Sequence, residues 1–95
     1  MSTAYTVREN TDARRFEIYD GSALIGLAEY LKSAEKISFT HTEVSPDYEG
    51  KGVGSQLIKT ALDTVRAEGG YQVRPLCPFV RSYIEKHPEY KDLLS

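Results

Sequence analysis

Hydrophobic and polar residues alternate along the first half of this 95-residue chain, which is the pattern of β-strands. Short polar connections separate the alternating runs, and Asp20-Gly21 is a dipeptide typical of a tight hairpin. Strands joined by such short connections pair as an antiparallel meander. The strands are expected at residues 5–9, 14–19, 23–31 and 36–44.

The last of these runs, residues 36–44, distributes its side chains over two faces by strict alternation. One face would carry Ile37, Phe39, His41 and Glu43, and the other would carry Ser38, Thr40, Thr42 and Val44. His41 is therefore expected beside core side chains.

Three glycines, each separated by one residue, stand where this strand gives way to a helix: Gly50, Gly52 and Gly54. Glycine adopts positive φ and allows another group to approach the backbone closely. The first N–H groups of a helix lack internal partners, and the helix dipole is positive there. The stretch therefore predicts a pocket for phosphate, and its alternative is a glycine-containing turn without a ligand.

The clearest single element is a helix over residues 55–68. Its apolar positions fall on one face and comprise Val53, Leu57, Ile58, Ala61, Leu62 and Val65. Gly69-Gly70 ends it. Residues 71–76 then indicate a short buried strand, which a right-handed crossover places parallel to the fourth strand. A short helix over residues 79–86 and a last docked turn over residues 89–94 complete the chain.

Composition indicates one modest domain spanning residues 1–95. The net charge of −2 argues against nucleic acid as a partner, and no apolar run is long enough to cross a membrane. Cys77 is the only cysteine, so a disulfide framework is excluded, which suits the cytoplasm. No Cys/His cluster has metal-ligand spacing. We expect a cytoplasmic monomer without a metal site.

Three motifs occur in a fixed order along the chain: His41-Thr42-Glu43-Val44, then Gly50-Lys51-Gly52-Val53-Gly54-Ser55, then Pro75-Leu76-Cys77-Pro78-Phe79-Val80. Together with the order of elements, they resemble the GNAT superfamily of acetyl-CoA-dependent N-acetyltransferases. The resemblance is greatest to a short, single-domain GNAT-like subfamily. It implies an α+β fold of the three-layer α/β GNAT type. In this fold a four-stranded antiparallel meander precedes the glycine loop, a helix, a parallel strand and a short C-terminal helix.

The chain also departs from the superfamily pattern. Gly52 and Gly54 match the last two positions of the superfamily's loop signature, whereas Glu49 replaces the expected Gln or Arg. Only residues 10–13 stand where larger members carry one or two helices. The tyrosine that many members use as an acid falls at Ile84, with Tyr83 one residue early, and the strand glutamate falls at Ser38. The superfamily's acid and base therefore cannot be transferred to this chain.

The resemblance implies a cofactor site built mainly from backbone. The pyrophosphate of acetyl-CoA would bind the N–H groups of Gly50, Lys51, Gly52, Val53, Gly54 and Ser55. Thr42 and Val44 would offer backbone groups to the pantetheine arm. The Lys51 side chain either adds charge or is a solvated lysine. Arg74 and Arg81 are candidates for holding the 3′-phosphate of CoA, with ordinary surface positions as the alternative.

Two residues are candidates for catalysis. Cys77 follows the parallel strand, where a thiol could accept the acetyl group and pass it on, and His41 is its only plausible base. The alternatives are a small buried cysteine and a hydrogen-bonded core histidine. In a direct route an amine attacks without Cys77, and Glu43 is a weaker candidate for the base.

The predicted function is therefore acetyl-CoA-dependent N-acetylation of a small amine or a protein amine. The alternative is a CoA or acyl-CoA binding module with little transferase activity. An unrelated phosphate-binding domain is less favoured, because Gly50-Lys51 is followed by Gly52 rather than by Ser or Thr.

Overall fold

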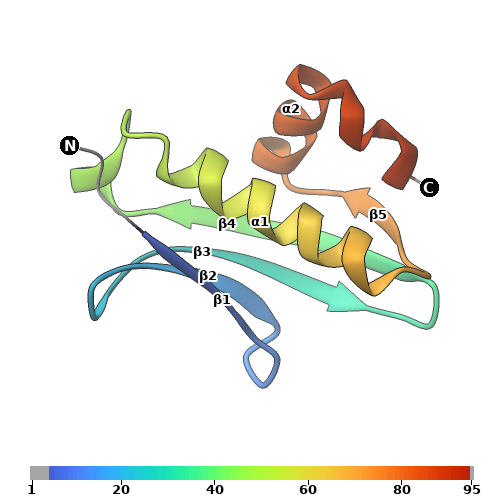
Figure 1. The fold of residues 1–95 in the computed structure, drawn as a ribbon, viewed down its shortest axis with the longest axis horizontal. Helices are drawn as coiled ribbons and strands as arrows, with labels where there is room; N and C mark the ends of the chain where they lie inside the picture. The colour runs from blue at the N-terminus through green and yellow to red at the C-terminus, as the bar shows by residue number, and fades with distance from the viewer. Residues whose placement is uncertain (1–4, 95) are drawn as a thin grey trace.

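The computed structural model describes residues 5–94 as one five-stranded sheet packed against helices (Figure 1). Strands β1 to β4 pair antiparallel in chain order, and β5 pairs parallel to β4 after the crossover through α1. The elements are β1 (Thr6–Asn10), β2 (Arg15–Asp20), β3 (Ala23–Lys32), β4 (Lys36–Val44), η1 (Pro46–Tyr48), α1 (Val53–Glu68), β5 (Gln72–Pro75), α2 (Pro78–Lys86) and η2 (Pro88–Leu93). The α+β class, the meander and the parallel last strand are confirmed.

The helices pack on one face of the sheet. Helix α1 contacts strands β1 to β4, while α2 contacts β4, β5 and α1 (Figure 1). Residues 5–94 thus make two layers, where three were expected. The reason is the turn of residues 11–14, which joins β1 to β2 and is too short to hold a helix over the other face. No helix within residues 5–94 could span a membrane.

The core fills the space between the sheet and α1. The rings of Phe16, Tyr30 and Phe39 lie 5.4–6.2 Å apart, and the expected apolar face of α1 is buried throughout. Each such side chain removed from water contributes about 1.5–3 kcal/mol. Helix α1 begins at Val53, two residues before the expected start, because Gly52 takes the N-cap position in the left-handed conformation.

A β-bulge at Thr40 changes which side chains of β4 face the core. Tyr30 pairs with Phe39 but Glu29 pairs with His41, so Thr40 is an extra residue in β4. A bulge shifts the alternation of the residues that follow it. Ile37 and Phe39 are buried, whereas His41 and Glu43 are exposed and Val44 packs against the core. The expectation that His41 and Glu43 share the core face is wrong for this reason.

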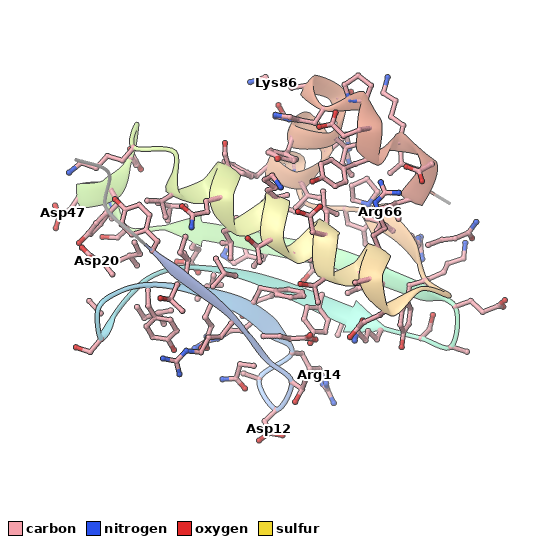
Figure 2. All side chains as sticks on the ribbon, viewed as in Figure 1. Asp12, Arg14, Asp20, Asp47, Arg66 and Lys86 are labelled. Atoms are coloured by element: carbon pink, nitrogen blue, oxygen red, sulfur yellow. The ribbon has the colours of Figure 1, made fainter. Side chains whose placement is uncertain are left out.

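Hydrogen bonds hold the C-terminal segment η2 against α1, and we call this set of contacts the latch. Arg66 donates to both carboxylate oxygens of Asp92, at 2.8 and 3.0 Å, and to the backbone oxygen of Glu89 at 2.7 Å (Figure 2). The hydroxyl of Tyr90, a buried residue, donates to Asp63 Oδ1 at 2.6 Å. The last docked turn expected from the sequence is thus present as η2.

The carboxyl of Asp63 makes the stability that the latch provides depend on pH. Burial raises its pKa, but hydrogen bonds from Lys59 and Tyr90 outweigh burial and hold the pKa below its usual value. A carboxyl whose pKa is lower in the folded state adds stability above pH of about 4, and this stability is lost as the pH falls through the lowered pKa.

Replacing Tyr90 with phenylalanine should weaken the latch. The change removes a hydrogen bond to a carboxylate and should lower the free energy of unfolding by about 1–2 kcal/mol. Urea titration followed by circular dichroism measures the loss. The matched control is Tyr71→Phe, because the Tyr71 hydroxyl makes no hydrogen bond within residues 5–94. Equal stability of the two variants would contradict the latch.

Candidate functional site

The three glycines of the loop have different structural roles. Gly50 and Gly52 have φ values of +80° and +77°, and a Cβ on either would meet no atom within 4 Å. Gly54 lies in the first turn of α1, where a Cβ would lie 2.5 Å from Phe79 Cζ. Two glycines therefore shape the turn and leave open space before it, while the third allows the α2 side chain Phe79 to pack closely.

The loop presents a group of unpaired backbone donors. The first hydrogen bond of α1 runs from Gln56 N to Gly52 O at 3.0 Å, and no side chain caps the helix. Within residues 5–94 the N–H groups of residues 50, 52, 53, 54 and 55 have no backbone acceptor. Lys51 differs, since its N–H donates to Tyr48 O at 3.3 Å. Five of the six expected donors are therefore available to a ligand.

A hydrogen bond from Tyr48 connects the loop to Asp20, the last residue of β2. Its hydroxyl donates to Asp20 Oδ2 at 2.6 Å, and this bond raises the pKa of Tyr48 (Figure 2). The Tyr5 ring meets the Tyr48 ring edge-on with centroids 6.2 Å apart, and Lys51 Nζ lies 5.5 Å from the Tyr48 ring centroid. These contacts hold η1, and so the glycine turn that follows it, in place.

The second half of β4 has an open edge. Strand β5 pairs with β4 only from Lys36 to Phe39, and the last backbone contact is Cys77 N to Phe39 O at 2.9 Å. On the other side, Ser45 N donates to Ile25 O of β3. Backbone groups alternate in direction along a strand, so those of Thr42 and Val44 point to the open edge. This is the arrangement that pairs with an extended, amide-containing ligand.

The two catalytic candidates lie on opposite faces of β4. Cys77 is buried, precedes α2, and its Sγ donates to Thr42 Oγ1 at 3.2 Å. His41 Nε2 lies 2.8 Å from Glu43 Oε2, and these side chains are 53% and 64% exposed on the face without helices. The structure thus brings Cys77 to Thr42 and His41 to Glu43, but it does not bring His41 to Cys77.

The face without helices carries ordered polar rows beside His41. Strand register aligns Arg15, Glu29 and His41 in one row, and Glu17, Leu27 and Glu43 in the next. Glu17 is buried and accepts hydrogen bonds from Tyr19, Arg15 and Asn10, of which the Tyr19 bond contributes most to lowering its pKa. On β4 the two rows end in His41 and Glu43, both of which face solvent.

The positions where the superfamily's acid and base would fall carry no such groups. Ile84 is a core residue, and Ser38 is half-buried in β4. The neighbouring Tyr83 stacks on His87 with ring centroids 4.0 Å apart. No group of three or more His, Cys, Asp or Glu within residues 5–94 could hold a metal ion.

Sequence reasoning missed two residues that shape the site, Tyr48 and Phe79. A signal for Phe79 was present, because a glycine inside the first turn of a helix indicates a close neighbour. Tyr48 carries no such signal, because its partner Asp20 lies 28 positions away in the sequence.

Comparison with known proteins identifies the family of this chain. Residues 15–93 match the family model described as GCN5-related N-acetyl-transferase, and the chain belongs to that family. The protein NATD1 of Gallus gallus and of Homo sapiens is 33% identical over 52 residues, which is 55% of this chain. The chain spans only about half of those relatives, since the match covers 46% and 45% of their lengths.

Solved structures share the fold. The ribosomal-protein-S18-alanine N-acetyltransferase from Escherichia coli superposes with a TM-score of 0.65 at 15% identity, covering 87% of this chain and 74% of that one. A GCN5-related N-acetyltransferase from Kribbella flavida gives a TM-score of 0.60 at 20% identity, over 78% of this chain and 21% of that one. At such identities the likeness concerns the fold alone.

Proposed function

We propose that this chain transfers an acetyl group from acetyl-CoA to an amine. The observation that carries the proposal is the set of five loop N–H groups that have no backbone acceptor within residues 5–94. A pyrophosphate supplies several anionic acceptors for such donors, and the start of α1 adds its dipole. A Cβ on Gly50 or Gly52 would meet nothing within 4 Å, so no atom of residues 5–94 blocks the space beside either glycine.

The open edge of β4 supports the same proposal. The amide groups of the pantetheine arm would pair with the backbone of Thr42 and Val44, as an added strand does. Acetyl-CoA would supply the acetyl group as a thioester: the amine nitrogen forms an amide bond to the carbonyl carbon, the carbon–sulfur bond breaks, and CoA leaves as the thiol. In this reaction the protein holds the pantetheine arm along β4, directed toward Thr42 and Cys77.

His41 is proposed as the base for direct attack by the amine. The acceptor would approach from the sheet face that carries no helix, where His41 and Glu43 are exposed. Nε2 of His41 faces Glu43, so Nδ1 remains to accept the proton that the amine loses. Cys77 lies on the other face with Thr42 as its partner, so direct attack does not use it. The uncovered face accommodates either a small amine or an amine on a protein.

Two measurements test the proposed function. Calorimetry with CoA and acetyl-CoA should give dissociation constants between about 1 μM and 1 mM, the usual range of KM values. Release of CoA should then follow on adding an acceptor from a panel of polyamines, amino acids, and peptides with lysine or a free N-terminus. Absence of binding at millimolar CoA would refute the proposal. Binding with no release across the panel would favour a CoA or acyl-CoA binding module.

A further inference from the structure

A hollow of about 370 Å³ lies at the edge of β5, the last strand of the sheet (Figure 1). Residues of β5, of α2 and of the chain beyond η2 meet there. The lining consists of Val73, Arg74, Pro75, Leu76, Arg81 and Leu94. No residue of the glycine loop is among them, so the two arginines that the sequence suggested for the 3′-phosphate of CoA belong to a separate hollow.

The hollow combines apolar side chains with two unpaired positive charges. Leu76 is 49% exposed, and Leu94 is half-buried against the core. Arg74 and Arg81 are exposed, and neither forms an ion pair within residues 5–94. A guanidinium binds a carboxylate through two parallel hydrogen bonds. The hollow therefore suits a ligand in which carboxylates stand beside apolar groups.

Arg74 faces the same side of the sheet as His41. Ile37 of β4 pairs with Val73 of β5, and both are buried in the core. Side chains alternate along a strand, so Arg74, the next residue of β5, points to the face without helices. It pairs with Ser38, and His41 lies three residues further along β4, which is about 10 Å. An extended peptide covers this distance in about three residues.

The charge of this face changes sign between the hollow and His41. Glu29 pairs with His41 in the strand register, and Glu43 Oε2 lies 2.8 Å from His41 Nε2. A protonated amine that arrives from solution is attracted to these carboxylates, whereas an acidic side chain is attracted to the arginines of the hollow. The pattern fits an acceptor whose amine lies about three residues from acidic side chains.

We propose that the hollow at β5 docks an acidic, leucine-containing segment of a protein acceptor, with Arg74 and Arg81 binding its carboxylates. The inference rests on the proposed function, and it selects an amine on a protein over a small amine as the acceptor. A small amine would reach His41 without using the hollow. The arginines are thus specificity-determining residues, and they take no part in the transfer itself.

Fluorescence anisotropy with two labelled peptides tests the inference. Each peptide has a central lysine and, three residues away on both sides, either Leu-Glu-Leu-Asp or its uncharged counterpart Leu-Gln-Leu-Asn. The acidic peptide should bind the wild-type chain about tenfold more tightly, since charge-assisted hydrogen bonds are stronger than neutral ones. The double variant Arg74→Gln/Arg81→Gln should lose this preference. High salt should also reduce it, because both arginines are exposed.

The matched control is Arg8→Gln/Arg14→Gln at the opposite edge of the sheet. It removes the same charge outside the hollow and should keep the preference. With acetyl-CoA present, Arg74→Gln/Arg81→Gln should raise KM for the acidic peptide about tenfold at unchanged kcat, because docking precedes the transfer. Kinetics with a small amine should not change, which separates lost docking from general damage to the fold.

The outcomes separate this inference from the proposed function. Equal affinity of the wild-type chain for the two peptides overturns the inference alone. A double variant that melts at a lower temperature but keeps the preference also overturns it, because the arginines then only stabilise the chain. A dimer in sedimentation velocity that the double variant dissociates would make a second copy the occupant and refute the acceptor role. Absence of CoA binding refutes the proposed function, and with it that role, even where the acidic peptide binds.

Discussion

Replacing Gly52 with valine should weaken CoA binding by about tenfold or more, or at least 1.4 kcal/mol. Gly52 has a φ of +77°, where a β-branched residue is strained by about 1–2 kcal/mol or more. The new side chain would also enter the open space before the free N–H groups, which is where the pyrophosphate is proposed to bind. Calorimetry with CoA gives the change directly.

Gly69→Val provides the matched control for this loss. Gly69 ends α1 with a φ of +71°, and a Cβ there would also meet nothing within 4 Å. With a ψ of 164°, Gly69 lies in a region that is essentially restricted to glycine, so valine is strained there at least as much as at Gly52. The residue lies at the opposite end of α1 from the loop. The control should lose stability and keep its affinity for CoA. An unchanged affinity in Gly52→Val would refute the assignment of the loop.

Replacing His41 with glutamine should lower kcat by about 100-fold, the usual contribution of a general base. Glutamine keeps a polar side chain at this position but cannot accept the proton. Because His41 lies on the face opposite the glycine loop's helix, the affinity for CoA should not change. Steady-state kinetics with the acceptor found in the panel measure kcat, and calorimetry with CoA measures the affinity.

Cys77→Ala separates direct attack from a route through the thiol. Under direct attack the variant should keep most of its turnover, and mass spectrometry of the wild-type chain mixed with acetyl-CoA should find no acetyl group on Cys77. An acetyl adduct on wild-type protein, together with loss of turnover in Cys77→Ala, would contradict the proposed role of His41 and establish the covalent route.

Much of the fold could be predicted from the sequence, because local patterns determine it. The alternation in residues 14–19, the Asp20-Gly21 hairpin and the apolar face of α1 each act over a few residues. The resemblance implied a three-layer fold, although the sequence already indicated that only residues 10–13 stand where larger members carry one or two helices. The structure has two layers because the turn of residues 11–14 holds no helix over the second face of the sheet.

The free backbone N–H groups of the glycine turn could be predicted from the sequence, but the direction in which His41 faces could not. Backbone groups at a glycine turn follow from the turn itself, so five of six loop donors were identified correctly as free. The placement of His41 failed because strict alternation assumes an unbroken ladder. The bulge at Thr40 is visible only in the pairing of β4 with β3, a contact between residues distant in sequence.

The bulge at Thr40 shifts the alternation of side chains and backbone groups in the rest of β4 by one residue. If Thr40 had a partner on β3, the ladder would continue unbroken, His41 and Glu43 would turn inward, and the backbone of Thr42 and Val44 would turn toward β3. Both the edge offered to the donor and the face offered to the acceptor would then be lost without changing any of those four residues. The one residue that β4 has in excess of β3, more than the identity of any one side chain, determines which reactant meets which side of the sheet.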